Sequence, residues 1–317
     1  MHGLLTIYRK ELADDFSSYR FMILFALIAM VSLILTYVVG LTLKQELEGV
    51  AKPSFVFLKL FTFGHIISLV QLVAIIGPVV GLILGFDTIN RERNEGTLSK
   101  LLSQPIYRDD VINGKFLAGV TTITVMLVSI VLLVTGLGLK MVGVVPGMEE
   151  VWRIIFYLVI SIIYISFWLG VAILFSILFR SVATSALAAV AVWVFFWLFF
   201  PMVAGSVASV TTGEITGTSA EAAIRQARLQ KAISLASPMG LYNDATATVI
   251  DPQRKTTRSI VLMGPMEQLS LARFYGPLPL SQSLLVVVPY IITLIAITAI
   301  CFAVSYTVFM RQEIRSV

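Results

Sequence analysis

The chain has 317 residues, of which 58% are hydrophobic and only 13% are Asp, Glu, Lys or Arg. Its mean hydropathy of +0.93 lies far outside the soluble globular range, in which charged residues make up about 25%. One cysteine, Cys301, and two histidines exclude an intramolecular disulfide and a typical zinc site. We attribute the net charge of +5 to basic loops that face anionic lipid, not to nucleic-acid binding.

The first residues predict an amphipathic helix. Leu5, Tyr8, Leu12 and Phe16 recur at helical spacing within residues 2–16. Such a helix either lies on the inner leaflet ahead of the first span or packs on protein. Both interpretations stay open.

Six apolar runs are long enough to cross the hydrocarbon core, which takes roughly 20 residues. These predicted spans are residues 21–43, 61–86, 116–139, 154–179, 182–204 and 283–310. No Asp, Glu, Lys or Arg falls inside them, and only His65 interrupts the second. Since proton-coupled carriers need ionisable groups in the membrane, the sequence argues against one; a sodium site built from backbone carbonyls stays open.

Basic residues predict the orientation. With both termini inside, the inner segments carry eleven Lys and Arg, and the short outer loops carry five. The 205–282 segment is left out of this count because it is too long for the positive-inside rule to apply. We therefore expect both termini in the cytoplasm and residues 205–282 as an extracytoplasmic cap of one or two helices with loops.

Two spans carry candidate packing or translocation residues. In the second span, Gly77, Gly81 and Gly85 lie four apart and let another helix approach closely, either within one subunit or at a subunit or translocation interface. In the fifth span, aromatic residues including Trp193, Phe196 and Trp197 cover every face. They predict interfacial anchors, with a hydrophobic substrate path as the alternative.

The segment 87–115 holds ten of the 41 Asp, Glu, Lys and Arg residues. After a break at Gly96, Thr97 can cap a short helix that Pro105 ends. Leu98, Leu101 and Leu102 share one face of that helix. This leucine face suits docking into a groove of a partner, or it lies on the bilayer surface; the residues alone favour neither.

Motifs for catalysis are absent. The sequence has no H-E-x-x-H, no G-x-S-x-G and no phosphate loop of the form G-x-x-x-x-G-K-[ST]. We therefore expect a non-enzymatic chain without catalytic or metal-binding residues. Any uphill transport draws its energy from a partner.

The segment "RERNEGTLSKLLSQPIYRDDVINGKF" closely resembles the cytoplasmic loop of type-2 ABC exporter permeases. The matching residues are Glu92, Arg93, Gly96, Thr97, Leu98, Leu101, Leu102, Pro105, Ile106, Arg108, Gly114 and Lys115. "YRKEL" (Tyr8 to Leu12) resembles the elbow helix of that family. "SPMGLYND" (Ser237 to Asp244) resembles a segment of the permease in the nitrous-oxide-reductase maturation transporter.

The resemblance implies an all-α integral membrane protein with an N-terminal interfacial elbow helix (1–20), six transmembrane helices and a cytoplasmic coupling helix (88–104). In the coupling loop, Glu92, Arg93 and Glu95 would be polar contacts, Gly96, Thr97 and Pro105 would shape the helix, and Leu98, Leu101 and Leu102 would be apolar anchors. It further implies a single transmembrane domain in the plasma membrane, paired with a second or homologous permease and two separate ABC ATPase subunits. ATP and magnesium would bind to those ATPases, and this chain would hold no cofactor.

The leading hypothesis is therefore the permease subunit of an ATP-driven ABC exporter, in which the 88–104 helix carries ATPase motion into the first, second and fifth spans. One alternative is a non-transporting subunit that relays ATPase motion to an extracytoplasmic partner through residues 205–282. A second alternative is a secondary carrier. Substrates of the family range from lipids and glycans to drugs and ions, so the resemblance names no cargo.

Overall fold

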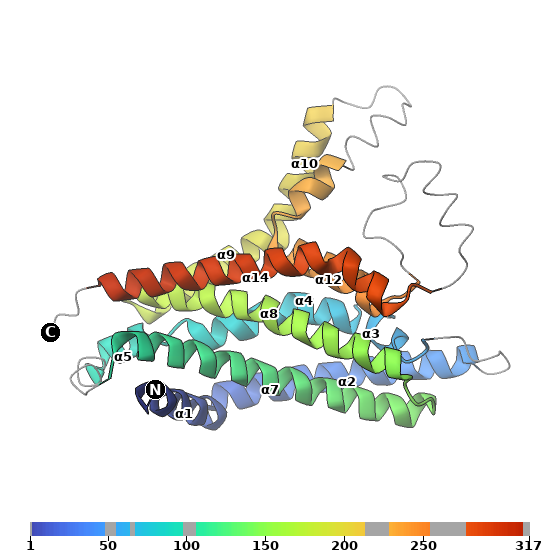
Figure 1. Cartoon of the computed structure of the whole chain (residues 1–317), viewed down its shortest axis with the longest axis horizontal. Helices are drawn as coiled ribbons and strands as arrows, with labels where there is room; N and C mark the ends of the chain where they lie inside the picture. Colours follow the sequence, from blue (N-terminus) through green and yellow to red (C-terminus); the bar gives the residue numbers. More distant parts are fainter. Residues whose placement is uncertain are drawn as a thin grey trace.

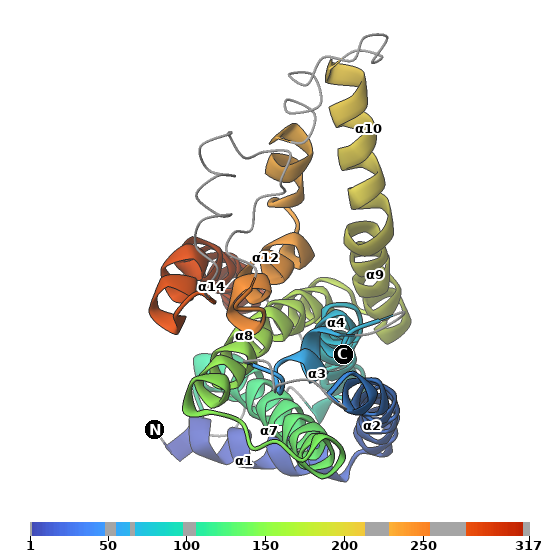
Figure 2. The same ribbon diagram turned by 90° about the vertical axis from the view of Figure 1, so that its right-hand side faces the viewer.

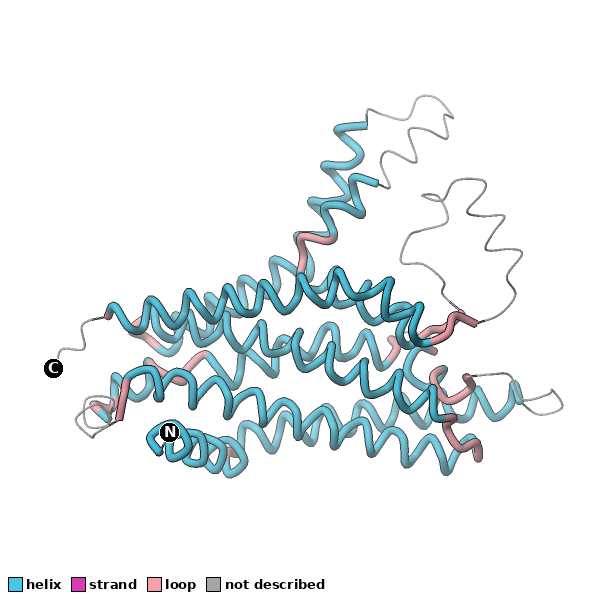
Figure 3. The backbone as a smooth tube through the Cα atoms, viewed as in Figure 1, coloured by secondary structure: helices cyan, strands magenta, loops and turns pink. Residues whose placement is uncertain are grey.

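The computed structural model describes residues 2–47, 55–63, 67–97, 106–212, 228–253 and 277–312. Within these ranges the chain is helical with connecting turns and contains no strand (Figure 3). The helices are α1 (His2–Ser17), α2 (Tyr19–Leu47), α3 (Lys59–Thr62), α4 (Leu69–Gly85), α5 (Asn90–Asn94), α7 (Arg108–Val142), α8 (Met148–Leu178), α9 (Val182–Val194), the π-helical turn η1 (Phe195–Phe199), α10 (Phe200–Thr212), α12 (Pro238–Ile250) and α14 (Leu280–Arg311).

Six helical segments are long and apolar enough to span a membrane, which confirms the prediction of an all-α integral membrane protein. They are Tyr19–Gln45, Leu69–Asn94, Arg108–Val142, Met148–Leu178, Val182–Val207 and Leu280–Arg311. The second begins at Leu69 and not at Phe61, because Phe63 is extended and Ser68 forms a capping box with Gln71.

α8 is the central helix of the bundle. It packs against α4, α7, α12 and α14, and the long helices run side by side along one direction (Figure 1). Trp168, Tyr157 and Tyr164 of α8 are among the largest fully buried side chains. The core therefore forms around α8, and the outer faces of α2, α9 and α14 remain apolar and exposed.

The glycine face of α4 lies directly against α8 of the same chain. A Cβ added to Gly81 would lie 2.7 Å from the carbonyl oxygen of Ile165, and one added to Gly85 would lie 2.6 Å from the Cβ of Ala172. A Cβ at Gly77 would lie 2.9 Å from the Ile165 side chain. These glycines therefore permit a close approach of two spans within one subunit.

α1 crosses α7 near the end of the bundle that holds α5 (Figure 1), and Figure 2 looks along the spans from the opposite end. Its Ile7 is buried and faces Gly114 of α7, where an added Cβ would lie 2.9 Å from the Ile7 side chain. Phe16 meets Phe21 edge to face, with ring centroids 5.4 Å apart, across the bend between α1 and α2. The predicted amphipathic helix is thus present and packs on α7.

α9, η1 and α10 form a continuous rod that leaves the bundle, and α10 projects away from the other helices (Figures 1 and 2). Phe196 contacts Trp168 of α8 edge to face, with ring centroids 6.2 Å apart. Trp193 and Trp197 stack on each other at 5.3 Å, and Trp197 is exposed. Of the three aromatic candidates, Phe196 is thus the one with a ring contact to α8.

The described part of the 205–282 segment does not simply cover the end of the bundle. α12 packs beside α8 and α14, and its Tyr242 stacks on Tyr164, halfway along α8, with ring centroids 4.4 Å apart. The hydroxyl groups of Tyr242 and Ser161 lie 3.0 Å apart. Residues 228–234 form a further helical stretch within the 205–282 segment.

Candidate functional site at one end of the bundle

The candidate site lies at the end of the bundle that holds α1, α5 and the start of α7, which we call the α5 end (Figure 1). The 87–115 segment enters this end from α4 and leaves it through α7. Its middle, residues 98–105, lies outside the described residues, and so do the predicted leucine face (Leu98, Leu101, Leu102) and the stop at Pro105. Both flanks of that middle are described.

A buried ion-pair network ties the first flank to two other helices. Lys115 of α7, whose side chain is 2% exposed, lies 2.9 Å from Glu11 of α1 and 3.0 Å from Glu92 of α5. Lys10 adds a contact of 3.2 Å to Glu92. We call Lys10, Glu11, Glu92 and Lys115 the Lys115 network. Since buried charges need partners, these four side chains fix α1, α5 and α7 relative to one another.

The charges of this network reinforce one another. Burial disfavours the ionised form of Glu11, but Lys115 and Lys10 outweigh it and hold the pKa of Glu11 below its usual value. Glu11 therefore stays an anion at neutral pH, and Lys115 keeps two carboxylate partners.

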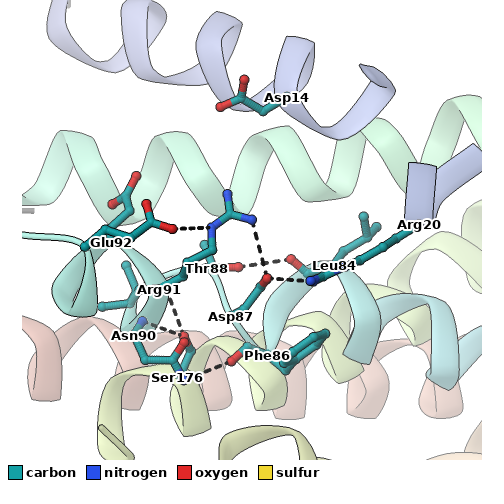
Figure 4. Close-up of polar contacts among 12 residues, drawn as sticks. Asp14, Arg20, Leu84, Phe86, Asp87, Thr88, Asn90, Arg91, Glu92 and Ser176 are labelled. Atoms are coloured by element: carbon teal, nitrogen blue, oxygen red, sulfur yellow. Dashed lines mark hydrogen bonds and ion pairs between the residues drawn. The ribbon is translucent and has the colours of Figure 1, made fainter. Parts of the chain in front are cut away.

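A second, more exposed set of ion pairs surrounds Asp87, just after α4. Figure 4 shows Asp87 between Arg20 and Arg91, at distances of 2.9 and 3.6 Å. The two arginine side chains are 63% and 55% exposed, so each pair contributes only about 0–1 kcal/mol. The set mainly links the start of α2 to the end of α4.

The turn between α4 and α5 is anchored to α8 and α9 by two serines. The Ser176 hydroxyl accepts hydrogen bonds from the backbone N–H groups of Ile89 and Asn90, at 2.9 and 3.1 Å (Figure 4). The Ser185 hydroxyl donates to the carbonyl of Phe86 at 2.8 Å. The entry to the charged segment is therefore held to the fourth and fifth spans through buried polar groups.

Both flanks of residues 98–105 contact the same residue at the end of α14. Arg93 donates to the side-chain oxygen of Gln312, and Arg108 donates to its backbone carbonyl at 3.0 Å. Gln312 in turn donates to the carbonyl of Ile177 at the end of α8, at 2.9 Å. Gln312 thus joins the two flanks to the fourth and sixth spans.

The remaining predicted residues occupy the edge of this site. Gly96 has a φ of +69°, a conformation that glycine adopts without strain, so the predicted break is present. Glu95 is exposed and lies 4.0 Å from Arg91. The Thr97 hydroxyl donates back to the Glu92 carbonyl at 3.2 Å; the helix that it was predicted to cap lies outside the described residues.

Several of these contributors were not predicted from the sequence. Lys115 was noted only as part of a motif, and neither Ser176 nor Gln312 was singled out. A glutamine that follows an apolar run could have been flagged as a polar residue at a membrane boundary. Nothing in the local pattern indicates its contacts with Arg93 and Arg108, about 200 residues away along the chain.

A second buried charge lies at the opposite end of the bundle. Arg153 of α8 is fully buried and donates to the carbonyl of Val249 at 2.9 Å, to the carbonyl of Leu278 and to Glu149 at 2.8 Å. It therefore holds the end of α12 and the start of α14 against α8. In the described ranges, no three His, Cys, Asp or Glu side chains are placed to hold a metal ion.

The chain matches a protein-family model. Residues 5–314 match the family model described as ABC-2 family transporter protein, which covers nearly the whole chain, including most of α1 and all six candidate spans. A comparison with curated proteins finds no match.

Proposed function

We propose, from the premise that this chain belongs to the ABC-2 family of transporter proteins, that it is the permease of an ATP-driven exporter. The family implies a membrane component that works with an ABC ATPase. In our proposal two separate ATPase subunits dock at the α5 end, bind ATP and magnesium, and drive substrate movement through the spans. Family membership favours neither a secondary carrier nor a non-transporting relay.

The observation that carries this proposal is the anchoring of both flanks of residues 98–105. On one side, Glu92 is bound by Lys115 and Lys10. On both sides, arginines contact Gln312. A force applied to the middle of the segment would therefore reach α1, α7, α8 and α14 through short polar contacts, in addition to the covalent link to α4.

This proposal changes the expected route of coupling. The sequence indicated the first, second and fifth spans as recipients of the motion. The contacts of Gln312 add the fourth and sixth spans, and Ser185 keeps the fifth span in the route. We propose that ATPase closure moves these helices together with the elbow helix α1.

The proposal also covers the orientation of the chain in the membrane and its pairing with a second permease copy. The excess of basic residues in the short inner segments supports a cytoplasmic α5 end in the plasma membrane. α9 has only two buried residues, Ser185 and Ala189, so this span is free to contact a second permease copy.

The docking assignment is tested by co-purifying the full chain with its ATPase and measuring ATP hydrolysis. We expect Leu101→Asp, or deletion of residues 95–103, to abolish both co-purification and stimulated hydrolysis. The matched control is Val145→Asp, which places the same charge on an 80% exposed apolar residue between α7 and α8. An ATPase that stays bound and stimulated in the Leu101→Asp protein would show that the docking assignment is wrong.

A further inference from the structure

Four arginines gather at the α5 end of the bundle, where α14 ends (Figure 1). Arg93 and Arg108 both donate to Gln312, the residue that follows Arg311. The fourth is Arg180, which lies in the turn between α8 and α9 and whose positive charge repels that of Arg93. We call the four residues Arg93, Arg108, Arg180 and Arg311 the arginine cluster.

Two hydrogen bonds hold the turn of Arg180 beside the other members. The side-chain amide of Asn94 donates to the Arg180 carbonyl at 3.2 Å. Gln312 donates to the carbonyl of Ile177, near the end of α8, at 2.9 Å. The cluster therefore joins four separate segments of the chain, namely α5, the start of α7, the turn after α8 and the end of α14.

The positive charge of the cluster is uncompensated. Arg93 and Arg108 bind neutral oxygens of Gln312, and none of the four arginines forms an ion pair with a residue that the structure describes. Four other basic residues at this end each pair with an Asp or a Glu; they are Lys10, Arg20, Arg91 and Lys115. Since like charges at close range repel one another, an anion from outside the chain would stabilise the arrangement.

Arg180 and Arg311 are the exposed members of the cluster. Within the described ranges, neither guanidinium group has a hydrogen-bond or ion-pair partner. A guanidinium group presents its N–H donors in a planar fork that matches the oxygens of a phosphate or a carboxylate. Both side chains are therefore available to bind such an anion.

The surface of α14 beside Arg311 is apolar. Ile300, Val304 and Arg311 follow one another at intervals of four and seven residues, so they share one face of the helix. Ile300 is 63% and Val304 is 43% exposed, and Figure 2 shows α14 at the edge of the bundle. A molecule with an anionic head and a hydrocarbon chain would meet donors at the end of α14 and apolar side chains along it.

We propose that the arginine cluster binds the phosphate group of an anionic membrane phospholipid. Arg180 and Arg311 donate to the phosphate oxygens, and an acyl chain lies along the face of α14 that carries Ile300. Arg93 and Arg108 add positive charge behind the phosphate. Basic pockets between the ends of transmembrane helices bind lipid head groups in this way. Phosphatidylcholine carries the same phosphate, but its quaternary ammonium group adds a positive charge that the cluster repels.

An acidic surface of the ATPase is the other partner that the charge of the cluster would suit. The lipid is favoured because the exposed apolar face of α14 continues from Arg311 along a span, where lipid is present and a soluble subunit does not reach. The inference goes beyond the proposed function and does not rest on it, since lipid binding is measured on the full chain without ATPase or ATP.

The test compares two lipids by native mass spectrometry of the full chain. The chain is released from detergent micelles that contain equal amounts of dioleoyl phosphatidylglycerol and dioleoyl phosphatidylcholine. We expect the bound glycerol lipid to exceed the bound choline lipid at least about tenfold, and Arg180→Gln and Arg311→Gln each to lower this ratio about fivefold, the effect of one basic charge near an anionic headgroup. Lys140→Gln removes an exposed basic charge in the last turn of α7, far from the cluster, and should leave the ratio unchanged.

Equal binding of the two lipids would overturn the proposal, and so would an unchanged ratio in Arg180→Gln and Arg311→Gln. Displacement of the glycerol lipid by equimolar inorganic phosphate would assign the cluster to a free anion instead. Loss of ATPase co-purification in both variants, with the lipid ratio unchanged, would assign it to the ATPase. Arg311→Lys separates loss of charge from loss of folding: it should keep the preference, and a ratio as low as that of Arg311→Gln would contradict an electrostatic site.

Discussion

Lys115 of α7 contacts Glu92 of α5 at 3.0 Å, although its own side chain is only 2% exposed. This pair joins the third span to the segment that leads into residues 98–105. The same ammonium group contacts Glu11 of α1 at 2.9 Å. A single buried cation therefore couples the elbow helix, the charged segment and a span.

Lys115→Met should destabilise the protein strongly. The change leaves Glu11 and Glu92 without their shared buried cation, and such a loss costs about 3–5 kcal/mol. Thermal unfolding in detergent measures it. In the double variant Glu92→Gln/Lys115→Met we expect part of the stability to return, because Lys10 then has to neutralise Glu11 and no longer Glu92 as well; a double variant less stable than Lys115→Met would argue against this network.

Gln312→Ala should separate ATP hydrolysis from transport. The variant removes the side-chain contacts with Arg93 and Ile177 while leaving residues 98–105 intact. We expect the ATPase to remain bound and the substrate moved per ATP hydrolysed to fall severalfold. Gln282→Ala, an exposed glutamine in the first turn of the same helix, is the control. If Gln312→Ala and Gln282→Ala move the same amount of substrate per ATP hydrolysed, Gln312 does not take part in coupling.

Gly81→Ala should push α4 away from α8. The added Cβ would lie 2.7 Å from the Ile165 carbonyl oxygen, a backbone atom that cannot rotate aside, and overpacking of this kind costs about 1–3 kcal/mol. The melting temperature should therefore fall. Gly136→Ala in α7 meets no atom within 4 Å and should be neutral or stabilising. The assignment of the glycine face to packing within one subunit fails if the two variants behave alike.

Asp15 should give the protein a pH dependence near pH 6. Burial raises the pKa of Asp15 from 3.8 to about 6; the Thr122 hydroxyl and Lys115 oppose this shift, and Glu11 and Asp14 add to it. Because the folded protein binds this proton more tightly than the unfolded chain does, the contribution of Asp15 to stability falls as pH rises from about 4 to about 6.

The measurement for Asp15 compares the melting temperatures of the unchanged protein and Asp15→Asn across that pH range. We expect the unchanged protein to lose stability relative to the variant as pH rises and the carboxylate forms. A constant difference between the two proteins from pH 4 to pH 7 would contradict this assignment.

The spans could be predicted from the sequence because a helix in lipid must satisfy its backbone internally and therefore needs a long apolar run. Their ends could not. α7 begins at Arg108 and α8 at Met148, ahead of the predicted apolar runs, because charged and polar residues extend the helices beyond the hydrocarbon region. A run of apolar residues does not indicate these additional helical turns at the ends of the spans.

The site was predictable only where its chemistry is local. Gly96 marked the break because a single residue carries that conformational signal. The partners of Glu92, and the contacts of Gln312 with Arg93 and Arg108, depend on helices that meet only after the bundle forms. The insertion of α12 beside α8 likewise follows from how Tyr242 packs on Tyr164, which no local pattern specifies.

The central claim, that the ATPase docks on residues 98–105, is tested most directly by site-specific photo-crosslinking in the assembled transporter. A photoreactive amino acid at Leu101 should form a covalent product with the ATPase, and the same group at Val145, at the opposite end of α7, should not. A crosslink from Val145 to the ATPase, with none from Leu101, would contradict the account.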